Sequence, residues 1–134
     1  MIYLTRKEHF SSSHILNNPE LDEKSNKILF GKCNNSHGHN YYLEVTLCGE
    51  IDRVSGYVVD LKILKKIISE EIIDKVDHFC LNDVNMFKNI IPTAENIAQT
   101  FWKILNDNIK FPNAKLYSIK LYETDKNFVE IRND

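Results

Sequence analysis

The hydrophobic pattern changes its period near the middle of this chain, and this change constrains the fold more than any other feature. From residue 39 to 51 apolar and polar side chains alternate, which predicts a half-buried antiparallel strand. The apolar side of this strand consists of Tyr41, Leu43, Val45 and Leu47. After Asp60, a plausible helix N-cap, apolar residues recur at helical spacing and predict a helix with one buried stripe. That stripe consists of Leu61, Leu64, Ile68 and Ile72.

The same patterns predict the rest of the secondary structure. The other predicted elements are strands over Ile2–Leu16, Ala114–Thr124 and Phe128–Arg132 and a helix over Thr93–Asn106. Residues 17–35 are polar, include Pro19 and Gly31, and predict a long loop. The order strand, strand, helix, helix, strand, strand predicts one α+β domain over residues 1–134. In it, two helices cover one face of a four-stranded, mostly antiparallel sheet. Neither edge strand carries proline or inward charge, so the edges invite pairing with another subunit.

The composition excludes several classes of protein. The chain has 134 residues, 17 of them basic and 19 acidic, and no basic stripe, which argues against nucleic acid as a partner. Its three cysteines form no C-x-x-C motif, so we expect no disulfide framework and a reducing, cytoplasmic location. The N-terminus has no apolar signal-peptide core, and no apolar run is long enough to span a membrane.

Three histidines indicate a metal site. His37 and His39 are two residues apart on a predicted strand, so their side chains share a face. His14 shares the predicted apolar face of the first strand with Phe10 and Leu16. Three protein ligands with one open position are typical of catalytic zinc. The alternative is a buried, hydrogen-bonded His14 and a solvated histidine pair.

Two further segments carry groups suited to proton transfer. Cys33 follows Lys32 in a polar run, where a lysine and a bound dication both favour the thiolate, a base or nucleophile. The alternative is a small buried hydrophobic residue, the usual role of a free cysteine. Asp77 precedes His78, and a carboxylate that orients an imidazole is a common acid–base device. Taken alone, that dipeptide is more typical of a polar loop after a helix.

Glu123 is unusual for its position. It continues the strand face that carries Ile119 and Leu121, so it should point inward near the strand end. A buried carboxylate needs donor groups, because burying it alone costs several kcal/mol, to an order of magnitude. The adjacent N–H groups of a pterin or guanine ring would supply them. The alternative is a frayed strand end with Glu123 in water.

Together these segments resemble the 6-pyruvoyl-tetrahydropterin synthase family, which includes the 6-carboxytetrahydropterin synthases of queuosine biosynthesis. The resemblance covers nearly the whole chain. The motifs that carry it are Phe10–His14, Phe30–Asn35, His37–Tyr41, Gly49–Asp52, Asp77–His78, Pro92–Asn96 and Tyr122–Asp125. It implies the tunnelling fold (T-fold), in which sheets from several subunits close into a barrel. It also implies a homohexamer of two stacked trimers with active sites at subunit interfaces.

The resemblance also assigns roles to residues. The implied zinc ligands are His14, His37 and His39, and the implied general base is Cys33. Asp77 and His78 would complete a proton relay from a neighbouring subunit. Glu123 would anchor the pterin ring, with Thr93 and Glu95 near it. The implied substrate is 7,8-dihydroneopterin triphosphate, and no redox cofactor is needed.

The product is less tightly specified than the family. We expect a zinc-dependent lyase that releases triphosphate and forms 6-pyruvoyl-tetrahydropterin, for tetrahydrobiopterin biosynthesis. The C-x-x-x-H-G-H spacing from Cys33 to His39 is closer to the 6-carboxy enzymes, which also release acetaldehyde. Ala94 replaces a threonine of the animal pattern, while Cys33 argues against the malaria-parasite branch, which has glutamate there. Two other hypotheses are a non-catalytic pterin- or metal-binding oligomer and a purely structural oligomer.

Overall fold

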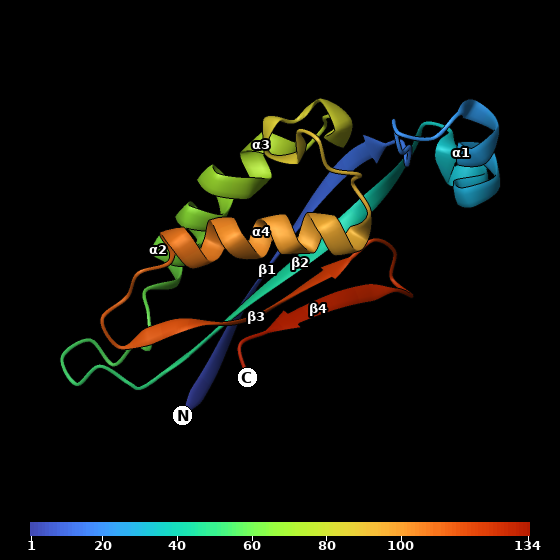
Figure 1. Cartoon of the computed structure of the whole chain (residues 1–134). Helices are drawn as coiled ribbons and strands as arrows, with labels where there is room; N and C mark the ends of the chain where they lie inside the picture. The colour runs from blue at the N-terminus through green and yellow to red at the C-terminus, as the bar shows by residue number, and fades with distance from the viewer.

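A four-stranded antiparallel sheet forms the base of the molecule. The computed structural model describes all residues, 1–134. The strands are β1 (Ile2–His14), β2 (His37–Gly49), β3 (Ala114–Tyr122) and β4 (Phe128–Arg132), in the order β1-β2-β3-β4 (Figure 1). The predicted α+β fold class is confirmed, and β4 has the predicted bounds.

Two helical segments lie across one face of this sheet (Figure 1). The first is α2 (Leu61–Ile68), which continues through a π-helical turn, Ser69–Ile73, into α3 (Asp74–Val76). The second is α4 (Ala94–Asn108). The predicted N-caps are confirmed, since side chains of Asp60 and Thr93 accept backbone N–H bonds at the two helix starts. No helix of the protein combines the length and apolar character needed to cross a membrane.

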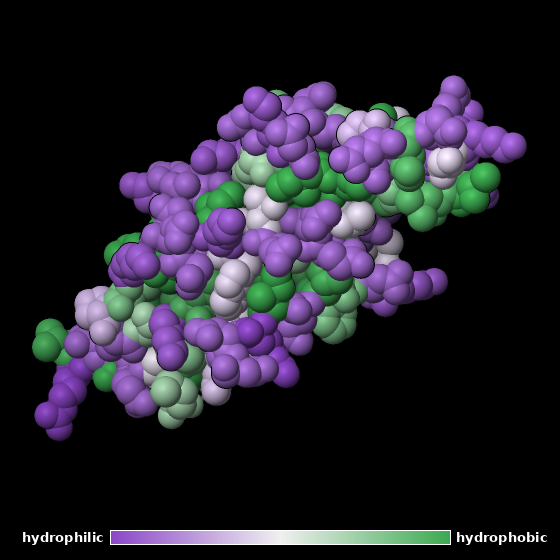
Figure 2. Space-filling view, in the orientation of Figure 1, coloured by the Kyte–Doolittle hydropathy of each residue, from purple (hydrophilic) through white to green (hydrophobic).

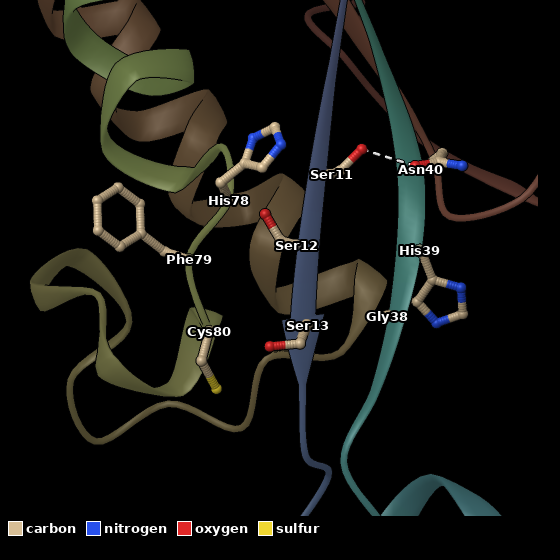
Figure 3. Close-up of a pocket in the computed structure, with 9 residues that line it drawn as sticks. All are labelled: Ser11, Ser12, Ser13, Gly38, His39, Asn40, His78, Phe79 and Cys80. Atoms are coloured by element: carbon tan, nitrogen blue, oxygen red, sulfur yellow. Dashed lines mark hydrogen bonds between the residues drawn. The ribbon is translucent and has the colours of Figure 1, made fainter.

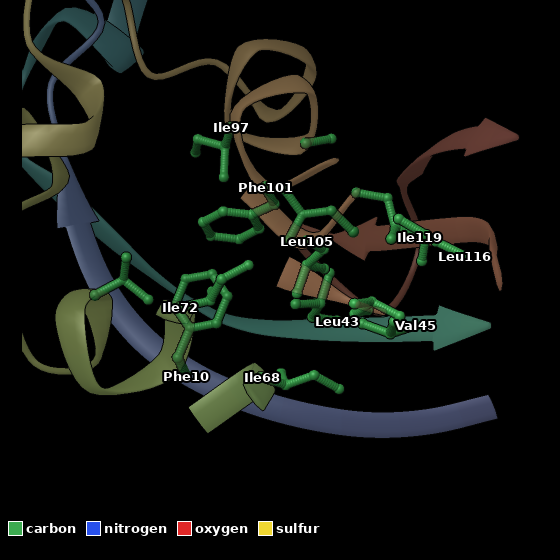
Figure 4. Close-up of a cluster of buried hydrophobic side chains, with 14 of the residues drawn as sticks. Phe10, Leu43, Val45, Ile68, Ile72, Ile97, Phe101, Leu105, Leu116 and Ile119 are labelled. Atoms are coloured by element: carbon green, nitrogen blue, oxygen red, sulfur yellow. The ribbon is translucent and has the colours of Figure 1, made fainter. Parts of the chain in front are cut away.

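The hydrophobic core lies between the helices and the sheet. It contains 21 buried residues, drawn from the apolar faces of both layers (Figure 4). Phe10 of β1 stacks on Tyr41 of β2 with 4.7 Å between ring centroids. Phe101 of α4 meets Phe10 edge-on at 5.8 Å and lies 6.0 Å from Phe87. These aromatic contacts join the helical layer to the two strands that carry the histidines.

Truncation of Phe101 should therefore be costly. Phe101 is fully buried, so Phe101→Ala is expected to lower the free energy of unfolding by about 3–5 kcal/mol through lost burial and a cavity. Urea denaturation followed by circular dichroism would measure it. The matched control is Phe79→Ala, because Phe79 is about half exposed. Equal losses for the two variants would contradict this description of the core.

The predicted long loop at residues 17–35 is wrong, because the segment contains helix α1 (Glu23–Phe30) and a 3₁₀ turn, Gly31–Asn34. The Asp22 side chain caps the helix start by accepting the Ser25 N–H, and Gly31 ends the helix at φ 57°. The usual sign of a helix is a stripe of apolar residues that becomes buried, and α1 has no such stripe because Ile28 and Leu29 are exposed. Figure 2 shows the resulting apolar surface at the position of α1.

A β-bulge changes the predicted face of β3. The pairing register shifts between Thr46 and Leu47, so that Leu47 lies opposite Leu116 while Thr46 lies opposite Ser118. Strict alternation from Ile119 and Leu121 would also put Tyr117 on the inner face, but the structure places it on the other face. Its ring instead meets Tyr3 on the outer face, 4.8 Å between centroids, and Leu116 is buried in its place.

The free edge of β1 is covered at one end. Residues 77–80 run beside it, where Ser11 and Ser13 exchange backbone hydrogen bonds with His78 and Phe79. The sequence predicted two open edges, and the structure leaves β1 open only ahead of Ser11. The covering segment is the one that carries the Asp77–His78 pair, so it holds this pair against the strand that ends at His14.

Candidate metal centre and active site

Strand pairing brings the three histidines together at one end of the sheet. His14 at the end of β1 lies directly opposite His37 at the start of β2, and His39 lies opposite Ser12. The ring of His14 is 4.5 Å from that of His37 and 5.1 Å from that of His39, between centroids. One ligand atom from each ring lies within 4.8 Å of the others. The three residues predicted as ligands therefore form one cluster that can hold a metal ion.

Backbone carbonyls fix the orientation of two of these rings. The Nδ1 atom of His14 lies 2.8 Å from the Pro92 carbonyl oxygen, and that of His37 lies 2.7 Å from the Asn35 carbonyl oxygen. A carbonyl oxygen can only accept, so Nδ1 carries the proton and Nε2 keeps its lone pair. The Nε2 atoms of His14 and His39 are buried and have no hydrogen-bond partner. Buried polar atoms without partners are rare, and a cation at this point would satisfy both.

Burial also keeps these imidazoles in the form that binds metal. Removal from water lowers the pKa of His14 and of His39 below the ordinary histidine value, because burial disfavours the charged ring. Metal coordination requires the neutral ring. Tyr41 packs against the cluster with its hydroxyl 3.4 Å from His14 Nδ1, and burial raises its pKa, so it remains a neutral phenol.

Glu123 points toward the histidine cluster from just beyond the end of β3. Its carboxylate oxygens lie 4.0 Å from His14 Nε2 and 3.9 Å from His39 Nε2. The side chain is 31% exposed, so it faces both the cluster and solvent. The inward orientation predicted from the alternation is confirmed. A ligand that reaches the histidines from solvent would meet this carboxylate.

Cys33 lies in the 3₁₀ turn Gly31–Asn34, and its side chain is exposed. Its carbonyl oxygen accepts the Leu16 N–H at 2.9 Å, which joins the turn to the chain just after His14. The alternative role of a buried hydrophobic residue is therefore excluded. The structure gives this thiol access to solvent and a backbone link to the strand of the first histidine.

Asp77 and His78 interact with each other and with β1. Asp77 Oδ1 accepts the Ser11 backbone N–H at 2.9 Å and lies 3.0 Å from His78 Nδ1. The bond from Ser11, followed by that from His78, lowers the pKa of Asp77, so the carboxylate is ionised at neutral pH. His78 has a left-handed backbone, φ 65°, and its ring is 81% exposed. The Asp77 carboxylate thus orients an accessible imidazole.

His78 borders a hollow of about 390 Å³ that His39 also lines. The rest of its lining comes from β1, β2 and the residues that follow His78. Figure 3 shows the His78 side chain beside β1, while the His39 side chain extends from the side of β2 that faces away from β1. Within one subunit, Asp77 and His78 make their side-chain contacts with each other and β1, and none with the metal cluster.

The segment before α4 contributes through a residue that sequence reasoning missed. Thr93 caps the helix by accepting the Asn96 N–H at 3.2 Å, and Glu95 lies in the first turn. Pro92, immediately before them, supplies the carbonyl that orients His14. Asn35 was missed as well, although its place two residues before His37 was a usable signal.

A model of the family described as 6-pyruvoyl tetrahydropterin synthase matches residues 3–134, almost the entire chain. The chain belongs to this family. The 6-pyruvoyl tetrahydrobiopterin synthase of Dictyostelium discoideum is 43% identical over 99% of this chain and 97% of its own length. The human synthase is 42% identical over 98% of this chain and 91% of its own.

Solved structures of the 6-pyruvoyl tetrahydropterin synthase family share the fold. The Caenorhabditis elegans enzyme superposes with a TM-score of 0.90 at 40% identity, covering 99% of this chain and 96% of that one. The Plasmodium vivax enzyme gives 0.71 at 18% identity over 99% and 98%, which supports the fold alone. The predicted family and the subunit architecture of the T-fold are confirmed. Closure into a barrel stays a prediction.

Proposed function

We propose that this protein is a lyase that converts 7,8-dihydroneopterin triphosphate into 6-pyruvoyl-tetrahydropterin and triphosphate, a step of tetrahydrobiopterin biosynthesis. The observation that carries the proposal is the cluster of His14, His37 and His39, with two buried nitrogen atoms that lack any partner. The relatives at 42–43% identity bear the name of this activity. A purely structural oligomer would have no use for such buried, unpaired nitrogen atoms.

The proposed metal is zinc, held by the Nε2 atoms of the three histidines. Zinc commonly takes three imidazole ligands and keeps a fourth position for substrate in catalytic sites. When bound, it would act as a Lewis acid that polarises the hydroxyl groups of the substrate side chain. Glu123 would accept hydrogen bonds from the N–H groups of the pterin ring. Because Glu123 lies beside His14 and His39, a ring bound there would have its side chain next to the metal.

Cys33 is the proposed general base. Its thiolate would remove a proton from the side-chain carbon next to the carbon that carries the triphosphate. The C–H electron pair then forms a carbon–carbon double bond, and the C–O pair leaves with the triphosphate. Internal proton transfers convert the resulting enol to a ketone and reduce the ring by as much as the side chain is oxidised, so no external oxidant takes part.

His78, oriented by Asp77, is the proposed carrier of these protons. The Asp77–His78 pair is exposed and makes no contact with the histidine cluster of its own subunit. We therefore place it in the active site of a neighbouring subunit, within a hexamer of two stacked trimers. Thr93 and Glu95 would lie near the pterin ring. The cytoplasm is the proposed compartment, since all three cysteines are free.

A product assay tests this function. Purified protein, loaded with zinc, is incubated with 7,8-dihydroneopterin triphosphate, and the products are identified by mass spectrometry. We expect triphosphate and 6-pyruvoyl-tetrahydropterin in equal amounts. Acetaldehyde and 6-carboxytetrahydropterin would instead establish the alternative reaction. A relative from Archaeoglobus fulgidus, 32% identical, is named as a putative synthase of that second product. Pterin binding without triphosphate release would establish a non-catalytic oligomer.

A further inference from the structure

Two asparagine side chains hold the residues that follow His14, and each belongs to a different part of the proposed machinery. Asn34 follows Cys33 in the 3₁₀ turn after α1, and Asn82 comes four residues after His78. Asn82 forms hydrogen bonds with the main chain of Ile15, and Asn34 forms one with the main chain of Leu16. The chain just after the first metal ligand is therefore the point where the base segment and the relay segment meet.

Asn82 acts on Ile15 as a neighbouring strand would. Its Oδ1 accepts the Ile15 N–H at 2.8 Å, and its Nδ2 donates to the Ile15 carbonyl at 2.9 Å. Residues 77–80 run beside β1 with backbone hydrogen bonds, and the chain then turns into a 3₁₀ segment, Leu81–Asp83. Because a side-chain amide has the same donor and acceptor as a peptide group, Asn82 continues the pairing where the backbone cannot.

Asn34 and Cys33 hold Leu16 in a similar way. The Cys33 carbonyl accepts the Leu16 N–H at 2.9 Å, and Asn34 Nδ2 donates to the Leu16 carbonyl at 2.9 Å. The turn Gly31–Asn34 contains no buried residue, and α1 buries only Asn26. Figure 1 shows α1 beyond the end of the sheet, apart from the two helical segments that cover the sheet. Apolar packing therefore does little to fix the thiol, and these polar bonds must do so.

We propose that Asn34 and Asn82 are positioning residues, which together fix the Cys33 thiol and the Asp77–His78 pair relative to the metal ligand His14. This inference rests on the proposed function. Groups that support a reacting residue from behind typically change activity by about 10–100-fold when removed, because small displacements spoil the reactive geometry. Neither asparagine touches the metal cluster, so the ligands themselves stay intact in their absence.

The test compares Asn34→Ala and Asn82→Ala with a matched control, Asn113→Ala. Asn113 also donates from Nδ2 to main-chain carbonyls, those of Glu50 and Val58, at the opposite end of β2. With zinc bound at one ion per chain, we expect the two site variants to lose at least about 10-fold in kcat with KM within about twofold. The control should keep kcat, although its melting temperature falls. Site variants that lose only melting temperature and keep kcat within twofold would overturn the proposal.

A second measurement does not depend on turnover. Amide hydrogen exchange should speed up in residues 10–17 of the two site variants and stay unchanged there in Asn113→Ala. The alkylation rate of Cys33 by iodoacetamide, located by peptide mass mapping, should change in Asn34→Ala. If the wild-type protein releases no triphosphate, the proposed function fails, and these two readouts still decide whether the asparagines fix the segments. Unchanged exchange and alkylation would overturn the inference.

Isosteric variants cover the case in which alanine prevents folding. Asn34→Asp and Asn82→Asp preserve shape but remove the Nδ2 donor. Asn82→Asp keeps the acceptor for the Ile15 N–H, so we expect its kcat to lie between those of the wild type and a full loss. Asn34→Asp keeps no bond to the Leu16 carbonyl and should lose as much as alanine. Wild-type kcat and exchange in both aspartate variants would contradict the proposal.

Discussion

Replacing Cys33 with alanine is expected to lower kcat for triphosphate release by about 10³-fold or more, while zinc and pterin still bind. The thiol is exposed and carries no packing, so its removal should leave folding unchanged. Metal content by elemental analysis, pterin binding by fluorescence and triphosphate release by chromatography would measure the three effects separately. Loss of the proton acceptor alone accounts for a loss of turnover with binding retained.

Cys48→Ala is the matched control for this substitution. Cys48 is buried near the end of β2, far along the strand from the histidines, so its loss should affect stability and leave turnover intact. Cys33→Ser adds a finer comparison, because a hydroxyl in the same place is a much weaker base than a thiolate. Turnover by Cys33→Ala at the wild-type rate would exclude the thiol as the base and would reassign proton removal to another group.

The strands and helix starts followed from local patterns in the sequence. Alternation identified β2, and β4 has the predicted bounds, because in each strand one face is less exposed than the other. The side chains of Asp60 and Thr93 cap their helices as predicted, since capping involves residues only two or three positions apart. Such interactions can be predicted from short stretches of sequence.

The features that were missed depend on interactions at longer range. Helix α1 has exposed Ile28 and Leu29 where an amphipathic pattern would bury them, and it is ordered instead by Asn26. This buried side chain donates to carbonyls of residues 18, 21 and 22 and accepts the N–H of residue 18. The bulge that turns Tyr117 outward arises from pairing with β2, so the sequence of β3 alone could not indicate it.

The candidate site was only partly predictable for the same reason. The spacing of His37 and His39 placed them on one face, but the position of His14 opposite His37 comes from the register of two strands 23 residues apart along the chain. The carbonyl that orients His14 belongs to Pro92, 78 residues away. Residue types can indicate metal ligands, whereas the groups that orient those ligands emerge only from the folded chain.

The largest effect on the metal is expected from His37→Ala. This change removes one of three ligands, so affinity for zinc should fall by more than about 100-fold, and the loaded protein should no longer hold one ion per chain after dialysis. Turnover should be lost together with the metal. Competition with a chromophoric chelator would measure the affinity. His9→Ala is the control, because His9 lies on the same sheet in an exposed position away from the cluster.

The pH dependence of binding provides an independent check on the same ligands. Protons compete with the metal for the imidazole nitrogen atoms, so affinity should fall as the pH falls. Burial lowers the pKa of His14 and His39, so these rings stay neutral at a pH at which exposed histidines are already charged. The metal-free protein should also lose stability as the pH falls below about 6.5, because the unfolded chain then binds more protons than the folded one. Two results together would contradict a buried cluster of neutral ligands. One is a metal-free wild type that is equally stable at pH 7.5 and 5.5, and the other is a zinc affinity that is unchanged in His37→Ala.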